Sequence, residues 1–404
     1  MSQKRIMTAL FVVVLLDAVG FGVILPVLPA LLTEITGESV ARAALYGGWL
    51  AALYAGAQFV AAPVIGNLSD CFGRRPVLLA ALLTFGLDYL IMGMAESLLL
   101  LFVGRLIAGI TGATFGVANS VIADVIPADE RAQWFGLVGA AFGGGFILGP
   151  VIGGFLGELG TRAPFYATAG LAFANALFVC WVMPETLARE NRRAFDWKRA
   201  NPLGALKQLR QFPVVYGLAV AVFFFMLGHW VLPATWSYYT IERFNWSERE
   251  IGFSLAFVGV LMMFVQAYLI RVVSQIWSPG RMVLIALVSA TVSLVGYALA
   301  PAAWLVYLFM LVGAVQGFFS PAVNTIATAR VGADAQGELQ GSLGSLSSLA
   351  AMLSPPLMTA VFEHYSASAN GVAEAVYFPG APYLLAAGLT MIAGGFVWHA
   401  LRQR

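Results

Sequence analysis

Long apolar runs dominate this chain and restrict the structures open to it. Of its 404 residues, 60% are hydrophobic and only 10% are charged, whereas a soluble domain is about 45–50% apolar. A helix crosses a bilayer with about 20 mostly apolar residues. Runs of that length begin near Ile6, Leu45, Pro76, Leu98, Trp134, Ala163, Phe212, Ile251, Met282, Trp304, Leu339 and Phe378. They lack the short polar–apolar alternation of membrane β-strands, so the sequence predicts an all-α membrane protein with twelve transmembrane helices.

The basic residues are distributed unevenly between the segments that join these runs. If the N-terminus lies inside, 17 Lys and Arg residues fall on that side of the membrane and four fall on the other. Positively charged connecting segments stay in the cytoplasm. Both chain termini are therefore expected to be cytoplasmic.

The longest polar stretch, residues 185–211, carries seven basic residues and separates six runs from six. The sequence thus predicts an N-terminal six-helix bundle over residues 1–184, a cytoplasmic linker over 185–211 and a C-terminal six-helix bundle over 212–404. A weak internal repeat supports two related halves, because a Gly-Arg pair precedes an apolar run after both the second and the eighth run.

Charges are concentrated in the turn expected between the second and third runs, GNLSDCFGRRPVLL. Gly66 and Gly73 are expected to let the chain turn tightly. Asp70 lies close enough in sequence to Arg74 to form an ion pair at the mouth of two helices. A simple topology anchor would need only the arginines, so the aspartate and the two glycines at fixed offsets exceed what anchoring requires.

The fifth run contains the glycine-rich stretch GLVGAAFGGGFILGPVIGG. Gly145, Gly149 and Gly153 recur every four residues, so they share one helix face and allow another helix to approach closely. Pro150 predicts a kink. On physical grounds alone, ordinary small-residue packing explains the stretch equally well.

Three ionisable residues are expected deep in the membrane: Asp17, Asp88 and Arg105. A charge at the bilayer centre costs at least ~2.5–3.5 kcal/mol, so such residues normally pair, face water or carry protons. For Asp17 the alternative is that it caps backbone groups at a helix break near Gly20 and Gly22. The C-terminal half offers no comparable group, since His229 is expected near the outer end of the seventh helix as a packing or interfacial residue.

These segments resemble motifs of the major facilitator superfamily, in particular its tetracycline/proton antiporters. The match is carried by LLDAVGFGVILPVLPALL, GNLSDCFGRRPVLL, GRLIAGITGAT, VIADVIPADERAQWFG and the glycine-rich stretch. The resemblance implies proton coupling by Asp17, Asp88, Arg105 and Asp124; gating by Gly66, Asp70, Gly73 and Arg74; and an antiporter motif of Gly136, Gly145, Gly149, Pro150, Gly153 and Gly154. Substrate contacts are expected from Gln58, Asn119, Trp230, Trp236, Gln266 and Phe318.

Two departures from the antiporter pattern concern the substrate. These exporters carry an aspartate in the ninth helix, where Ala290 or a neighbour stands here, and can carry a histidine where this chain has Met262. The expected function is export of a drug such as tetracycline, as its metal complex, or of a related lipophilic compound in exchange for protons. Ala290→Asp is expected to increase transport of metal–tetracycline.

The resemblance further implies a monomeric transporter of a bacterial cytoplasmic (inner) membrane with no enzymatic activity, no nucleic-acid partner, no metal site and no cofactor. The proton gradient supplies energy, and Mg²⁺ would travel only with the substrate. Alternatives are an exporter of another small molecule (multidrug, lipid or siderophore) and a metabolite/proton symporter. A membrane enzyme acting on lipid is disfavoured because His229, His364 and His399 show no triad-like or zinc-like spacing.

Overall fold

The structure is a computed structural model that describes residues 3–112, 114–127, 130–195, 213–331, 336–366 and 377–402. All regular secondary structure in these ranges is helical. Twelve helical stretches of the described chain are long and apolar enough to cross a membrane, which confirms the predicted class and number of spans. Residues 196–211 of the expected linker lie outside the described residues.

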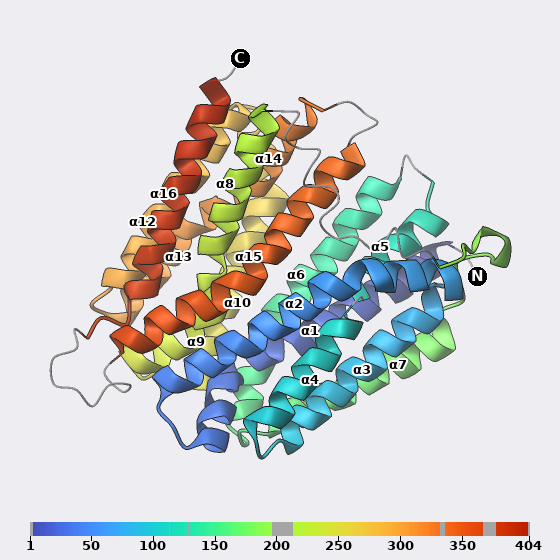
Figure 1. The fold of residues 1–404 in the computed structure, drawn as a ribbon, viewed down its shortest axis with the longest axis horizontal. Helices are drawn as coiled ribbons and strands as arrows, with labels where there is room; N and C mark the ends of the chain where they lie inside the picture. The colour runs from blue at the N-terminus through green and yellow to red at the C-terminus, as the bar shows by residue number, and fades with distance from the viewer. Residues whose placement is uncertain are drawn as a thin grey trace. The chain divides into compact units, whose positions relative to one another are not determined.

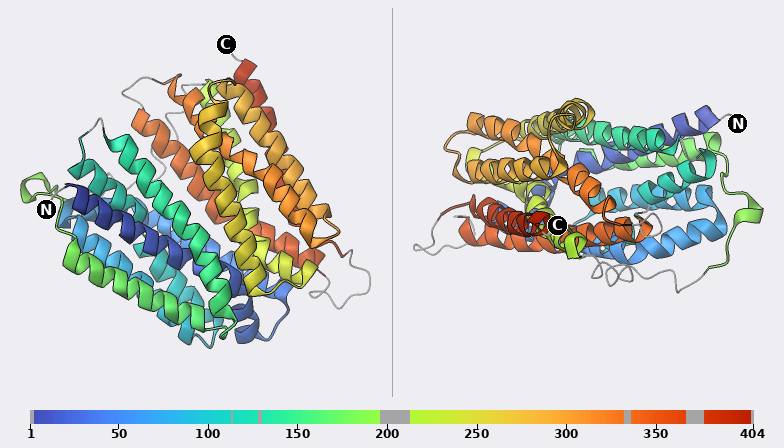
Figure 2. Two further views of the ribbon diagram at one scale, coloured as in Figure 1. Left: turned by 180° about the vertical axis from the view of Figure 1, so that it is seen from behind. Right: turned by 90° about the horizontal axis from the view of Figure 1, so that it is seen from above.

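The chain divides into two compact units, of which unit 1 comprises Met1–Gly37, Leu53–Asn201 and Ser247–Gly259. It contains α1 (Gln3–Thr36), the second part of α2 (Val40–Phe72), α3 (Arg74–Met94), α4 (Leu98–Thr111), α5 (Thr114–Val125), α6 (Arg131–Gly157), α7 (Ala163–Val182), η1 (Arg189–Asn191) and the first part of α10 (Glu248–Phe264). Helix α1 packs along α6 and α7, and α7 also packs along α3 (Figures 1 and 2).

Unit 2 comprises Glu38–Ala52, Pro202–Trp246 and Val260–Arg404. It contains the first part of α2, α8 (Pro213–His229), α9 (Val231–Phe244), the end of α10, η4 (Val265–Leu269), α11 (Ile270–Val273), α12 (Pro279–Leu299), α13 (Ala303–Ala314), η5 (Val315–Phe318), α14 (Phe319–Thr328), α15 (Gln336–Tyr365) and α16 (Ala381–Arg402). Helix α16 packs against α8 and α12 (Figure 1).

Local sequence explains several helix boundaries. Helix α12 begins at Pro279 after the N-cap Ser278, whose hydroxyl accepts a hydrogen bond from the Arg281 amide at 3.4 Å. Pro26 and Pro29, by contrast, do not end α1. Proline is tolerated inside membrane helices because neighbouring groups satisfy the freed backbone.

Four of the twelve spans in the described chain are not continuous α-helices. One changes from α4 to α5 around Gly112, and another from α8 to α9 at Trp230. The span that begins with α10 contains the π-helical turn η4, and the span that begins with α13 contains the 3₁₀ turn η5. Irregular backbone at membrane depth persists only where protein or a water-filled cavity surrounds it, so these interruptions are candidate positions for a functional site.

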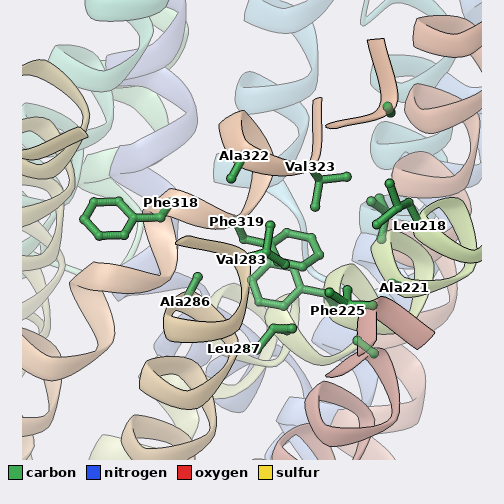
Figure 3. Close-up of a cluster of buried hydrophobic side chains, with 14 of the residues drawn as sticks. Leu218, Ala221, Phe225, Val283, Ala286, Leu287, Phe318, Phe319, Ala322 and Val323 are labelled. Carbon is green, nitrogen blue, oxygen red and sulfur yellow. The ribbon is translucent and has the colours of Figure 1, made fainter. Parts of the chain in front are cut away.

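The apolar core of unit 2 forms between α8, α12 and the η5–α14 segment. Phe225 and Phe319 stack at its centre with ring centroids 3.9 Å apart, whereas Phe318 extends away from this pair (Figure 3). Phe318 and Ala290, which belong to the same core cluster, are each only 1% exposed. Both side chains are therefore core residues.

Candidate functional site

A buried ion pair joins α3 to α4 inside unit 1. Asp88 Oδ2 pairs with Arg105 Nη2, and both side chains are buried. The pair is tightly packed, because a Cβ atom on Gly104 would lie 2.8 Å from Asp88 Oδ1. Removing one partner of a buried ion pair strongly destabilises a protein, because the other charge is left buried without compensation. The structure thus brings together two residues that the sequence placed separately at membrane depth.

Two tyrosines surround the Arg105 guanidinium. Its central carbon lies 5.6 Å from the Tyr54 ring centroid and 5.7 Å from that of Tyr89. The Tyr89 hydroxyl donates a hydrogen bond to the Gly20 carbonyl at 3.1 Å, which ties the cluster to α1. Aromatic faces stabilise a desolvated cation. The sequence analysis missed both tyrosines. The one signal that could have indicated them is that an arginine buried in the membrane needs neighbouring groups that stabilise its charge.

Asp17 lies on α1, half-buried, and hydrogen-bonds the side chain of Thr114 at the start of α5. Helix α1 continues without interruption through Gly20 and Gly22, so the alternative of a break in α1 at these glycines is wrong. The interruption lies instead at the end of α4, where Gly112 has a non-helical backbone conformation (φ −69°, ψ 69°). Asp17 is thereby placed beside a helix break contributed by another span.

Gln58 also reaches this interruption. Its Nε2 donates a hydrogen bond of 2.6 Å to the Gly112 carbonyl, one of the groups that the end of α4 leaves without a helical partner. Asn119 lies half-buried on α5, three residues after Gly116. Of the two polar residues of unit 1 that were expected at the substrate, Gln58 therefore has a direct structural contact with the helix break.

The charged motif lies where α2 ends and α3 begins. Helix α2 runs through Gly66 to Phe72, so the expected turn at Gly66 is wrong. The change of direction occurs at Gly73 alone, which has φ 106°. This backbone conformation is open to glycine and strongly disfavoured for other residues.

Arg74 is the centre of a charged network in the motif. Its Nη1 donates to Asp70 Oδ1 at 2.6 Å and to Ser69 Oγ at 2.9 Å, and its Nε donates to Asp124 Oδ2 at 2.8 Å. The expected Asp70–Arg74 pair is therefore present. Asp124 was expected beside the proton-coupling residues, but its carboxylate belongs to the Arg74 network.

Glu185, after the end of α7, completes this network and was missed from the sequence. Its Oε1 accepts a hydrogen bond from the Arg74 amide at 2.9 Å, and its Oε2 accepts one from the Arg75 amide at 3.3 Å. A carboxylate at a helix N-terminus satisfies free amides and interacts favourably with the helix dipole. The residues are more than 100 positions apart, so only the fold could show this contact.

Replacing Gly73 by alanine is expected to destabilise the protein by about 1–3 kcal/mol, the cost of holding a non-glycine residue in such a backbone conformation. The added Cβ would also lie 2.7 Å from the Glu185 carboxyl carbon. Gly66→Ala is the matched control, because no atom lies within 4 Å of a Cβ at that position. Thermal unfolding of the purified variants should show a lowered midpoint for Gly73→Ala alone; equal midpoints would contradict the special role of Gly73.

The glycine-rich face of α6 packs against α1. A Cβ at Gly145 would lie 2.7 Å from the Leu15 carbonyl oxygen, one at Gly149 would lie 2.6 Å from that of Val19, and one at Gly153 would collide with that of Val23. The predicted close helix approach at these three glycines is confirmed. Gly136, in contrast, has open space around it.

The remaining residues of the stretch face a different neighbour. A Cβ at Gly154 would lie 2.7 Å from the Glu248 carbonyl oxygen at the start of α10, and a Cβ at Gly252 would collide with the Pro150 carbonyl. Pro150 lies inside α6, which continues as one helix through it. The stretch thus packs α6 against two helices of unit 1.

Unit 2 contains a mixed polar and apolar cavity of about 270 Å³, whose lining includes Gln266, Gln316 and His229. His229 lies at the junction of α8 and α9 inside the Val214–Phe244 span, so its expected position near the outer end of the helix is wrong. A larger recess beside α12 and α13, about 410 Å³, is almost wholly apolar.

Two aromatic residues expected at the substrate pack in the interior instead. Trp236 is 3% exposed and contacts the rings of Tyr239, Trp246, Tyr297 and Tyr383. Phe318 belongs to the apolar core. Trp230 is half-buried at the α8–α9 junction, adjacent to His229. Of the C-terminal residues expected at the substrate, Gln266 is the one found in the cavity lining.

The position of Ala290 argues against the expected gain of metal–tetracycline transport by Ala290→Asp. Because it is buried in the core and is not part of the cavity lining, Ala290→Asp would place a carboxylate among apolar side chains at a cost of several kcal/mol. The expected result is therefore reduced stability with no gain in metal–tetracycline transport. Ala290→Ser is a smaller polar control, and the amount of folded protein in membranes is the measurement; increased metal–tetracycline transport by Ala290→Asp would contradict this placement.

The described chain has the features of a polytopic secondary transporter: twelve spans, an intramembrane ion pair and interrupted helices that contact polar side chains. The sequence profile of the Major Facilitator Superfamily matches residues 10–355, and the chain belongs to this family. It is consequently a membrane transporter and not an enzyme.

Relatives extend over nearly the whole chain. The chain is 38% identical over 374 residues to the tetracycline resistance protein, class C, of Escherichia coli, which covers 92% of this chain and 93% of the relative. It is 39% identical over 373 residues to the class E protein of Escherichia coli, with 91% and 90% covered. The solved structure of the nucleoside transporter NupG covers 100% of both chains with a TM-score of 0.79 at 14% identity, which shows the fold.

Proposed function

We propose that this protein exports a drug-like compound, such as tetracycline or a related lipophilic molecule, in exchange for protons. The observation that carries the proposal is the buried Asp88–Arg105 pair with its two flanking tyrosines. The names of the relatives, tetracycline resistance proteins, support a drug as the cargo. We place the chain as a monomer in a bacterial cytoplasmic membrane, and the excess of basic residues on one side supports cytoplasmic termini.

Protonation of Asp88 would remove one charge of the buried pair and leave Arg105 uncompensated. A change of several kcal/mol in a buried pair is sufficient to shift a two-state conformational equilibrium. Asp17, beside the α4–α5 interruption, provides a second carboxyl group in the same unit. Proton entry is thereby coupled to a change between inward-open and outward-open states.

The Arg74 network contributes a gate at the end of α2. Asp70 and Arg74 form one side of it, and Asp124 and Glu185 fix Arg74 from α5 and from the segment after α7. These contacts stabilise one conformation and must be lost or rearranged in the other. Gly73 permits the short connection on which the network depends.

Drug accumulation in intact bacteria tests this function. Cells that express the protein should hold less tetracycline or a less polar test drug than control cells, and a protonophore should abolish the difference. Energy comes from the proton gradient alone, so ATP depletion at constant gradient should have no effect. Greater accumulation in the expressing cells would indicate uptake and contradict the proposal.

A further inference from the structure

Three helix interruptions of unit 2 supply polar side chains to its cavity of about 270 Å³. His229 is the last residue of α8, Gln266 lies in the π-helical turn η4, and Gln316 lies in the 3₁₀ turn η5. Mid-helix π-turns occur frequently at functional sites, and discontinuous membrane helices commonly form the substrate sites of transporters. The convergence of three such irregularities indicates a ligand site rather than a packing defect.

The two turns are in direct contact, and glycine makes this possible. A Cβ at Gly317 would lie 3.2 Å from Val265 Cγ1 and 3.5 Å from Met262 Sδ. Gln316 is also fixed from the other side, since its Oε1 lies 3.3 Å from His229 Nδ1. When Nδ1 carries the proton and donates to this oxygen, the pair offers the Gln316 amide group as a donor and His229 Nε2 as an acceptor.

The chemistry of the lining restricts the ligand. Ser320 and Asn324 add further neutral polar groups, and none of the described residues that line the cavity is Asp, Glu, Lys or Arg. A cation bound here would lose hydration without gaining an opposite charge, which is unfavourable. Amides and hydroxyls instead suit keto, hydroxyl and amide groups, which exchange hydrogen bonds without net charge.

The apolar part of the lining suits a flat ring. Phe225 lies nearly parallel to His229, with centroids 5.8 Å apart and an interplanar angle of 12°. Phe225 also stacks on the ring of Phe319, which fixes its position (Figure 3). Met226 and Met262 add flexible thioether side chains, which adapt to ligands of different shape.

We propose that this cavity binds the exported compound through an aromatic, hydrogen-bonding part without net charge, and that no divalent metal ion accompanies it. The inference rests on the proposed export function and specifies its substrate class. It departs from the expectation of a cationic metal–tetracycline complex, because the cavity lacks a carboxylate to pair with such a cation.

Equilibrium binding to the purified full-length protein tests this proposal without a proton gradient. The probes are chloramphenicol, which has no net charge; tetraphenylphosphonium, a lipophilic cation; and tetracycline in EDTA or in excess Mg²⁺. We expect saturable binding of chloramphenicol and of metal-free tetracycline, with Mg²⁺ changing the tetracycline Kd by no more than about twofold. Tetraphenylphosphonium should bind at least about tenfold more weakly than chloramphenicol.

Variants then locate the binding. Replacing Gln266 and Gln316 together by leucine removes two hydrogen-bonding groups and should weaken chloramphenicol binding about tenfold. Gln275→Leu is the matched control, because Gln275 is exposed in the turn after α11 and is not part of the lining. Met262→Asp places a carboxylate in the lining and should increase tetraphenylphosphonium affinity.

The proposal is overturned by any of three results: no saturable binding of chloramphenicol, tetracycline binding that requires Mg²⁺, or unchanged chloramphenicol binding in the double leucine variant. These outcomes are separable from failure of the export function. Binding without proton-coupled export would contradict only the function, whereas export that requires Mg²⁺ would contradict only the ligand class.

Discussion

Gly149→Ala is expected to eliminate most transport. Its Cβ would lie 2.6 Å from the Val19 carbonyl oxygen and 2.7 Å from Gly22 Cα, both in the backbone of α1. Backbone atoms cannot rotate away as a side chain can, so α1 and α6 must separate. Overpacking of this kind costs about 1–3 kcal/mol or more, along the most extensive helix contact of unit 1. Drug efflux and the amount of folded protein in membranes measure the effect.

Gly139→Ala provides the matched control on the same helix. No atom lies within 4 Å of a Cβ at Gly139, so this variant should retain full efflux and normal folding. Alanine is also the better helix former, which excludes helix propensity as the cause of any loss at Gly149. Equal activity of the two variants would show that the close approach of α6 to α1 is not required.

Asp88→Asn is expected to reduce proton-driven drug accumulation to the level of vesicles without the protein. Asparagine cannot alternate between charged and neutral forms, and it leaves the Arg105 cation without its counter-ion. Breaking a buried ion pair in this way costs about 3–5 kcal/mol. The measurement is drug uptake into everted vesicles with an imposed pH gradient, normalised to the protein inserted.

Two controls separate coupling from folding in this experiment. Glu96→Gln makes the same chemical change at an exposed position outside the spans and should leave uptake unchanged. The double variant Asp88→Asn with Arg105→Gln removes both charges and should recover stability while remaining uncoupled. Full proton-driven uptake by Asp88→Asn would exclude Asp88 from the mechanism.

The spans and the local motifs could be predicted because their signals are local. Long apolar runs fix the number of helices, and the four-residue spacing of Gly145, Gly149 and Gly153 fixes their shared face. The Asp70–Arg74 pair followed from two charges four residues apart on the chain. Gly66 was misassigned because a glycine beside a charged segment was interpreted as a turn residue, whereas α2 continues through it to Phe72.

The remaining contacts depend on residues that are distant in sequence. Glu185 reaches the start of α3 from the end of α7, and Tyr54 reaches Arg105 from a different helix. No pattern in the sequence indicated the π-helical turn that contains Gln266. Trp236 and Phe318 show the converse error, because aromatic residues suit both a drug cavity and a packed core and only the fold distinguishes them.

Proton exchange is tested most directly in everted membrane vesicles that contain the full-length protein. The vesicles are energised to acidify their lumen, and a pH-sensitive dye follows the gradient as tetracycline, with and without Mg²⁺, and then chloramphenicol are added. Antiport predicts that drug enters the lumen as protons leave, so the lumen becomes less acidic, and that Asp88→Asn abolishes this response. If no drug dissipates the gradient, or if dissipation persists in Asp88→Asn, then proton-coupled export through the Asp88–Arg105 pair is contradicted.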